Sequence, residues 1–304
     1  MPDTGNEEAA LVVNTQSRRG QRLYGKAKSE LARRGIPVRD SFPVRDASRL
    51  SAVVQEVLAQ GYRFMIVGGG DGTVSSVASV LADRNIRLGL LPMGTANNFA
   101  RANRIPLALS AAVEVLASGR EASVDLGRID GVCFTNAVSV GISSAVHRGS
   151  PDPLKRHFGR VGYLMAAARE VAAFRGFACR LRLDGVLHET AALDVRIANG
   201  PFQGGLRVVE GAGVESGDLA VRVIKGPSKW AYAGAWARFA TGRRADPGAI
   251  ETFRARDIEI DTDPPQFVSV DGEVMRRTPA RVTIVPAALR LMVPRLPEDG
   301  PPGG

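Results

Sequence analysis

The sequence has few of the residues that form disulfide frameworks or metal clusters. Only two cysteines and three histidines occur among 304 residues, and their spacing matches no metal-binding pattern. No stretch approaches the about 18 consecutive apolar residues of a membrane-spanning helix. The polar, acidic N-terminus lacks the basic and apolar regions of a signal peptide. These absences lead us to expect a reduced, cytoplasmic protein.

Aromatic residues are scarce as well, at 6% of the chain. Because few of them lie among the basic residues, a stacking platform for nucleic acid is not expected. Basic residues outnumber acidic ones by 40 to 31, which gives a net charge of +9. This excess fits an anionic partner such as a nucleotide or an anionic membrane surface, although the dispersed arginines also fit an ordinary solvated surface.

A glycine-rich loop follows the strand that we predict at residues 64–67. The loop reads Gly68-Gly69-Gly70-Asp71-Gly72-Thr73 and leads into a helix with apolar periodicity. Glycines let backbone N–H groups approach a ligand closely, and a helix N-terminus favours anions, so the loop suits phosphate. A carboxylate there repels phosphate oxygens unless a cation bridges them. We therefore expect Asp71 to bind Mg²⁺ or to act as a base.

The loop differs from two common phosphate-binding motifs. A Walker A loop needs a lysine that is absent here, and a dinucleotide-binding loop needs glycine where Thr73 stands. Taken alone, the loop could be an ordinary turn between strand and helix. A second polar loop, Pro92 to Arg101, follows the strand predicted at 88–91 and contains Gly94, Thr95 and Asn97. Two such loops at adjacent strand ends predict a cleft.

Together the loops resemble the diacylglycerol kinase catalytic-domain family. The residues that carry the resemblance are Gly69-Gly70-Asp71-Gly72-Thr73 and Pro92-x-Gly94-Thr95-x-Asn97-x-Phe99-Ala100-Arg101. This family includes bacterial lipid kinases and the sphingosine and ceramide kinases, and NAD kinases share the first loop. The resemblance implies ATP as phosphoryl donor with Mg²⁺. The implied nucleotide-side residues are Asn14, Gly69, Gly70, Asp71, Gly72, Thr73, Gly94, Thr95 and Asn97.

Two domains and a tail are expected. Strand–helix alternation through residue 122 predicts an α/β domain with a doubly wound parallel sheet. From 123 to 294, short strands between turns predict a β-rich, sandwich-like substrate domain, with helices over 161–171 and 228–241. Residues 295–304 are rich in proline and glycine, which predicts disorder. The resemblance implies the same two-domain plan. The segment 198–206 resembles another family signature, and we interpret it as a turn-rich loop at the cleft between the domains, with a plain turn as the alternative on residue type alone.

A pair of carboxylates near the C-terminus is the candidate for acid–base chemistry. Val270-Asp271-Gly272-Glu273 is typical of a β-hairpin that turns at Asp-Gly, and a plain turn is the alternative. The family has an Asp-Gly-Glu at this place, with a carboxylate proposed as general base. The resemblance therefore implies that Asp271 or Glu273 deprotonates the acceptor hydroxyl. The expected catalytic residues are Asp271, Glu273 and Asp71, with Asp71 as the metal ligand.

The chain also departs from the family pattern. The Asn-Glu or Asn-Asp pair that serves the nicotinamide substrate in NAD kinases is Ser75-Ser76 here, which argues against NAD as acceptor. The usual Asn-Asp of the second loop is Asn97-Asn98. Glu215-Ser216-Gly217-Asp218 lies where relatives have an Asp-Asp-Gly that can hold a structural Mg²⁺. Because the carboxylates are rearranged, the sequence leaves that second metal site open.

We therefore expect an ATP- and Mg²⁺-dependent kinase that phosphorylates a hydroxyl of a diacylglycerol-like lipid. The chain would dock reversibly on an anionic membrane surface, would not bind nucleic acid, and could form a homodimer. One alternative is a related kinase acting on NAD or another non-lipid alcohol. Another is a catalytically silent nucleotide- or lipid-binding regulator, which would fit the altered residues Thr15, Ser75, Ser76, Asn98 and Ser216.

Overall fold

The computed structural model describes residues 8–149, 174–226, 234, 241 and 248–296. The expected helix over 161–171, nearly all of that over 228–241, and the tail from residue 297 lie outside these residues. Among the described helices, none is long and apolar enough to cross a membrane.

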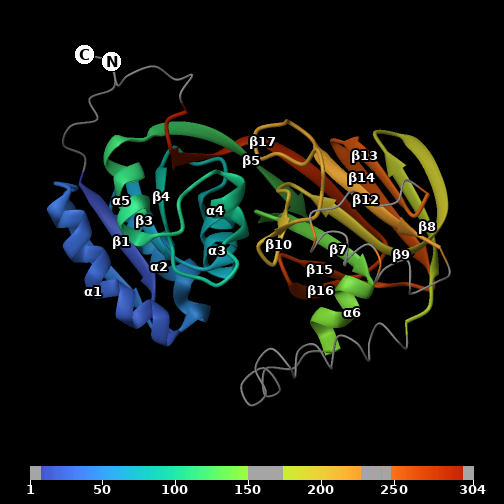
Figure 1. Cartoon of the computed structure of the whole chain (residues 1–304), viewed down its shortest axis with the longest axis horizontal. Coiled ribbons are helices and arrows are strands. Elements are labelled where there is room, and N and C mark those ends of the chain that lie inside the picture. The colour runs from blue at the N-terminus through green and yellow to red at the C-terminus, as the bar shows by residue number, and fades with distance from the viewer. Residues whose placement is uncertain (1–7, 150–173, 227–233, 235–240, 242–247, 297–304) are drawn as a thin grey trace.

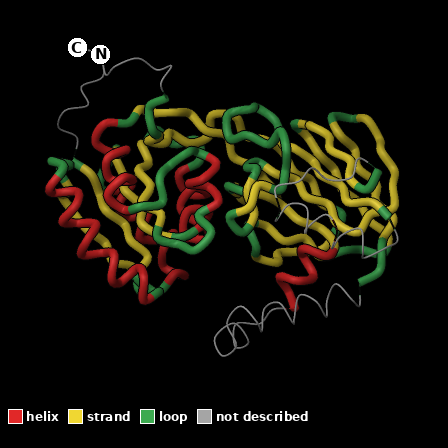
Figure 2. The backbone as a smooth tube through the Cα atoms, viewed as in Figure 1, coloured by secondary structure: helices red, strands yellow, loops and turns green. Residues whose placement is uncertain are grey.

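The N-terminal unit is an α/β domain on a parallel sheet with strand order β2-β1-β3-β4. Helix α1 contacts α5, and α2 contacts α3, as expected where helices cover both faces of a doubly wound sheet. Figures 1 and 2 show the long helices gathered around this half. The elements are β1 Ala9–Asn14, α1 Arg18–Arg33, β2 Val38–Val44, a 3₁₀ turn Ala47–Arg49, α2 Leu50–Ala59, β3 Phe64–Gly69, α3 Asp71–Leu81, β4 Arg87–Pro92, α4 Asn98–Ala102 and α5 Leu109–Ser118.

Local sequence explains why this unit forms. Strands β1 and β3 begin Ala-Ala-Leu-Val-Val and Phe-Met-Ile-Val, and every one of these residues is buried. Continuous apolar runs are typical of parallel strands covered on both faces. Helix α1 begins where the Ser17 hydroxyl accepts a hydrogen bond from the Gly20 N–H at 3.0 Å, because a serine at this position satisfies one of the first free N–H groups of a helix.

The C-terminal unit is β-rich, as predicted, and mostly antiparallel. Strand β9 is central, pairing with β7, β8 and β12. The elements are β5 Arg120–Ile129, β6 Val132–Phe134, β7 Ala137–Gly141, α6 Ile142–Gly149, β8 Phe177–Leu183, β9 Val186–Ala198, β10 Phe202–Gln203, β11 Leu206–Arg207, β12 Leu219–Lys225, β13 Ile250–Ala255, β14 Asp257–Asp263, β15 Phe267–Val270, β16 Glu273–Arg277 and β17 Ala280–Val293.

Strand β17 joins the two units. It is 14 residues long, pairs antiparallel with β5, and ends beside β4 in parallel register, with Leu291 opposite Leu88. One sheet therefore runs continuously through both halves of the molecule (Figure 1). The division that we expect after residue 122 falls inside β5, and it stays a prediction.

Gly127 allows the β5–β6 hairpin to close over an aromatic ring. It pairs with Phe134 in the ladder, and a Cβ atom at Gly127 would lie 2.0 Å from Cζ of that ring. The ring is fully buried, so it cannot swing into solvent. We expect Gly127→Ala to lower the free energy of unfolding by about 1–3 kcal/mol, measured by urea denaturation.

Gly25→Ala is the matched control for that change. Gly25 lies in α1, and a Cβ atom there would meet nothing within 4 Å. Because alanine is a better helix former than glycine, we expect this variant to gain up to about 1 kcal/mol. Equal stability of the two variants would contradict the packing described at Gly127.

Candidate active site

Asp71 lies where the two predicted loops meet. It is the first residue of α3, directly after β3, and Gly70 before it is extended. Its Oδ1 accepts a hydrogen bond from the Phe99 N–H at 3.1 Å, and its Oδ2 accepts a longer one from Nδ2 of Asn98 at 3.4 Å. Since β3 and β4 are neighbouring parallel strands, both loops leave the same edge of the sheet, and Asp71 joins them.

The two loops approach closely because both lack a side chain at the point of contact. A Cβ atom on Gly94 would lie 2.5 Å from Cα of Gly70, a distance that real Cβ atoms do not reach. Asn97 then holds the second loop in shape: its Oδ1 accepts from the Gly94 N–H, and its Nδ2 donates to the Gly94 carbonyl, both at 2.9 Å. Within this structure, Gly94 and Asn97 therefore hold each other.

Some of the residues expected around the first loop are buried, and others are exposed to solvent. Nδ2 of Asn14 donates to the Thr73 hydroxyl at 2.9 Å, so the end of β1 holds the start of α3. Thr73 is buried and packs on Gly69, where a Cβ atom would lie 2.4 Å from Cβ of Thr73. Gly72 and Thr95 are exposed. A ligand can thus approach Gly72 and Thr95 directly, whereas Asn14 and Thr73 hold the loop from its buried side.

The first turn of α3 presents its backbone N–H groups. The first hydrogen bond within this helix runs from the Val74 N–H to the Gly70 carbonyl at 3.0 Å, so the N–H groups of residues 71–73 precede the intrahelical ladder. Such groups, with the positive end of the helix dipole, attract anions.

A basic side chain lies beside the second loop, and sequence reasoning missed it. Nη1 of Arg19, an exposed residue of α1, donates to the Gly94 carbonyl at 3.0 Å. The sequence carried one signal for it: the segment from Asn14 to Gly20 resembles a family loop that usually reads Asn-Pro-x-Ser-Gly, and Arg18 and Arg19 interrupt its Ser-Gly pair. The position of Arg19 adds a positive charge next to the two glycine loops.

Burial makes the charge on Asp71 costly. Desolvation raises the pKa of Asp71 above its ordinary value near 3.8, and the charge of Asp271 raises it as well, while backbone N–H groups of residues 97–99 act in the opposite direction. The carboxylates of Asp71 and Asp271 come from different units of the chain. The charge of Asp271 therefore acts on Asp71 across the junction of the two units.

Asp271 is fully occupied by hydrogen bonds. It forms the predicted turn with Gly272, both with positive φ. Its Oδ2 accepts from the N–H and the hydroxyl of Thr135, and its Oδ1 accepts from the N–H groups of Asn136 and Ala137, all at 2.9 Å. These four donors use the acceptor positions of both oxygens. Asp271 therefore fixes the hairpin to the start of β7.

Glu273, two residues later, has the opposite surroundings. It begins strand β16 and is exposed. None of its atoms hydrogen-bonds or pairs with a charged group in the part of the chain that the structure describes. Of the two candidate bases, Glu273 is thus the one whose oxygens remain available.

The loop after β9 links both sides of the junction, where the sequence places it. The Gly205 N–H donates to Oδ1 of Asn98 at 2.9 Å, next to Asp71. At the other end of the loop, Nδ2 of Asn199 donates to the carbonyl groups of Asp125 and Thr135 at 2.8 and 3.1 Å. This loop therefore connects the residue beside Asp71 with the segment that holds Asp271.

Comparisons with known proteins identify the family of the chain. Residues 8–129 match the family model of the diacylglycerol kinase catalytic domain, and residues 136–293 match that of the YegS C-terminal NAD kinase beta sandwich-like domain. A relative named "Probable lipid kinase YegS-like" from Pseudomonas fluorescens is 33% identical over 269 residues, covering 88% of this chain and 87% of the relative. One of the same name from Pseudomonas aeruginosa is 30% identical over 293 residues, covering 95% and 91%.

A solved structure shares the fold. The crystal structure of a putative diacylglycerol kinase from Bacillus anthracis superposes with a TM-score of 0.78 at 24% identity, covering 97% of this chain and 99% of the other. The chain is thus a kinase, a phosphotransferase, with a diacylglycerol kinase catalytic domain. More narrowly, it belongs to the family of YegS-like kinases, in which that domain precedes a YegS C-terminal domain. The family and fold class expected from the sequence are confirmed.

Replacing the Asp71 carboxylate should stabilise the free protein. Because its pKa is raised in the folded state, stability falls as pH rises from 3.8 through the raised value, and the ionised group is a cost at pH 7. Asparagine can still accept from the Phe99 N–H. We expect Asp71→Asn to unfold about 1–3 °C higher than wild type at pH 7, with a smaller difference at pH 4. Thermal unfolding at both pH values measures this, and a larger gain at pH 4 would contradict it.

Proposed function

We propose that this chain is an ATP- and Mg²⁺-dependent lipid kinase that transfers the γ-phosphoryl group of ATP to a hydroxyl of a diacylglycerol-like lipid. One observation carries the proposal: a half-buried carboxylate at a helix N-terminus, Asp71, interacts electrostatically with Asp271 of a hairpin on which a second carboxylate, Glu273, is exposed. The names of the relatives, probable lipid kinases, support the substrate class.

The donor side is built for a triphosphate. The N–H groups at the start of α3 would bind phosphate oxygens, and the Arg19 guanidinium beside Gly94 would add a positive charge. Asp71 would hold Mg²⁺, and its surroundings fit a cation, since its charge is desolvated and lies near that of Asp271. When bound, Mg²⁺ would offset the negative charge of the phosphates.

The acceptor side divides two tasks between two carboxylates. The oxygen of the lipid hydroxyl would attack the γ-phosphorus, forming a new O–P bond, while the bond to the bridging oxygen breaks and ADP leaves. Glu273 would accept the hydroxyl proton. Asp271 would place the hairpin through its bonds to the segment Thr135–Ala137. Phosphoryl transfer depends mostly on positioning and charge neutralisation, so these parts are sufficient.

Docking on a membrane would bring the lipid to the site. The substrate headgroup lies at a bilayer surface, and the chain carries a net charge of +9. Positively charged surfaces are attracted to anionic lipids, and salt screens that attraction. We therefore propose reversible peripheral association with anionic membranes.

An acceptor panel tests the reaction. The full chain is incubated with γ-labelled ATP, Mg²⁺ and anionic vesicles containing diacylglycerol, ceramide, sphingosine or a phospholipid with a free hydroxyl, and separately with NAD. We expect label in a lipid, less at high salt, and a loss of several powers of ten in Asp71→Asn. Label in NAD alone would replace the proposal with a related kinase. ATP binding without transfer to any acceptor would favour the silent regulator.

Paired substitutions separate the two hairpin carboxylates. We expect Glu273→Gln to keep the stability of wild type and to lose about 10²–10⁴ in kcat, as for a missing general base. Asp271→Asn should lower the unfolding temperature, because an amide NH₂ would then face backbone N–H groups. Glu189→Gln, an exposed glutamate of β9, is the control. Full turnover in Glu273→Gln with loss in a folded Asp271→Asn would make Asp271 the base.

A further inference from the structure

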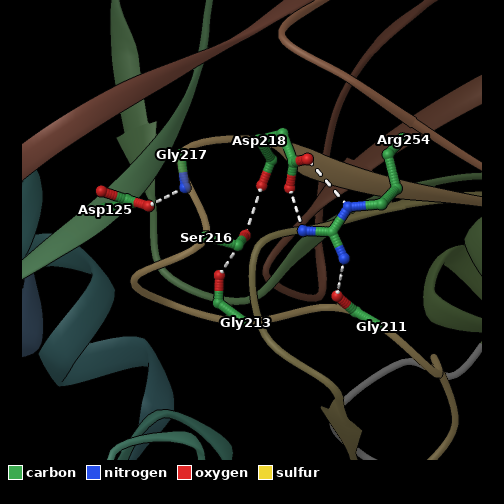
Figure 3. Close-up of polar contacts among 7 residues, drawn as sticks. All are labelled: Asp125, Gly211, Gly213, Ser216, Gly217, Asp218 and Arg254. Atoms are coloured by element: carbon green, nitrogen blue, oxygen red, sulfur yellow. Dashed lines mark hydrogen bonds and ion pairs between the residues drawn. The ribbon is translucent and has the colours of Figure 1, made fainter.

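A loop in the C-terminal unit lies where the family resemblance places a structural Mg²⁺. It runs from Gly211 to Asp218, between β11 and β12, and Figure 3 shows its polar contacts. The loop is attached to the rest of the protein at Asp125, a buried residue of β5. The Asp125 N–H donates to the Val214 carbonyl at 2.6 Å, and its Oδ2 accepts from the Gly217 N–H at 2.7 Å.

Arg254 of strand β13 closes this loop with three of its N–H groups. Its Nε donates to Oδ2 of Asp218 at 2.8 Å, its Nη2 donates to Oδ1 of the same carboxylate, and its Nη1 donates to the Gly211 carbonyl (Figure 3). A planar guanidinium on both oxygens of a carboxylate is the strongest common form of ion pair. The hydrogen bond from Arg254 lowers the pKa of Asp218.

The side-chain oxygen atoms of Asp125, Ser216 and Asp218 are already engaged. Mg²⁺ requires about six oxygen ligands at about 2.1 Å. Besides the groups bound by Arg254, the Ser216 hydroxyl donates to the Gly213 carbonyl at 2.7 Å and lies 3.1 Å from the Asp218 carbonyl. The second oxygen of Asp125 accepts from the Ala287 N–H at 2.8 Å.

The carboxylates that contact this loop are already paired, Asp218 with Arg254 and Asp125 with backbone N–H groups. Glu215, the other acidic side chain of the loop, is exposed. A divalent metal at Asp218 would have to replace Arg254, so the residues of the loop fit a guanidinium better than a divalent metal.

We propose that Arg254 is the built-in cation of the 211–218 loop, so that this loop keeps its conformation without a divalent metal. The Mg²⁺ requirement of the protein would then be confined to the nucleotide site. The inference concerns the fold of the loop, and it holds whether or not the proposed reaction is correct.

The loop matters because it supports the active-site junction. The Asp125 carbonyl accepts from Nδ2 of Asn199, which also donates to the Thr135 carbonyl, and the Thr135 N–H binds Asp271. The Arg254 guanidinium thus stabilises a loop that is bonded to Asp125, and Asn199 links Asp125 to the segment that holds Asp271.

Hydrogen exchange tests the proposal locally, because Mg²⁺ at Asp71 could change global stability. The apo full-length protein is compared in EDTA and in Mg²⁺, following peptides that cover residues 211–218. In wild type we expect equal protection in both, and less than one divalent ion per chain by elemental analysis. Faster exchange of this loop in EDTA, or one tightly bound ion lost together with that protection, would overturn the proposal.

Arginine substitutions provide the matched pair. We expect Arg254→Ala to accelerate exchange in the 211–218 loop by about tenfold or more. Arg281→Ala is the control. Arg281 of β17 forms a similar pair with both oxygens of Asp257 in β14, but it does not touch the loop. Unchanged loop exchange in Arg254→Ala, or equal acceleration in both variants, would show that Arg254 forms an ordinary surface ion pair.

Discussion

The close approach of two glycine loops is the constraint on which the site depends. Gly70 and Gly94 meet where any side chain would collide, and only at this separation can the Asp71 carboxylate accept from the Phe99 N–H of the second loop. The contact has an electrostatic cost, since burial raises the pKa of Asp71. Perturbed carboxyl pKa values cluster at functional sites, which supports the role proposed for Asp71.

The C-terminal hairpin is held by a carboxylate that has no free acceptor position. Asp271 binds Thr135, Asn136 and Ala137, and these residues lie at the join between β6 and β7. The long strand β17 ties the same unit to β4. The hairpin is therefore placed by backbone bonds and not by flexible side chains, which suits a reaction that depends on positioning.

Sequence reasoning predicted the two-part fold, while the functional roles of the site residues stay predictions. The apolar runs of β1 and β3 and the Asp271-Gly272 turn are local signals, so they were readable. The roles of individual polar residues were not. Asn97 holds Gly94, only three positions away, where the sequence predicted a nucleotide contact. Arg19 contacts Gly94 across 75 positions, which no local pattern connects. Likewise, Arg254 and Asp218 are 36 residues apart, a distance at which no spacing rule connects them.

The neutral residue at position 98 fits this arrangement in a way that a carboxylate would not. Asn98 donates to Asp71 with its amide nitrogen and accepts from the Gly205 N–H with its oxygen, so one side chain joins the glycine loop to the loop after β9. An aspartate could accept from Gly205 but could not donate, and it would place a second negative charge 3.4 Å from Asp71. Like charges that close repel strongly when partly buried. The amide therefore lets the two units contact each other at Asp71 before any cation is bound.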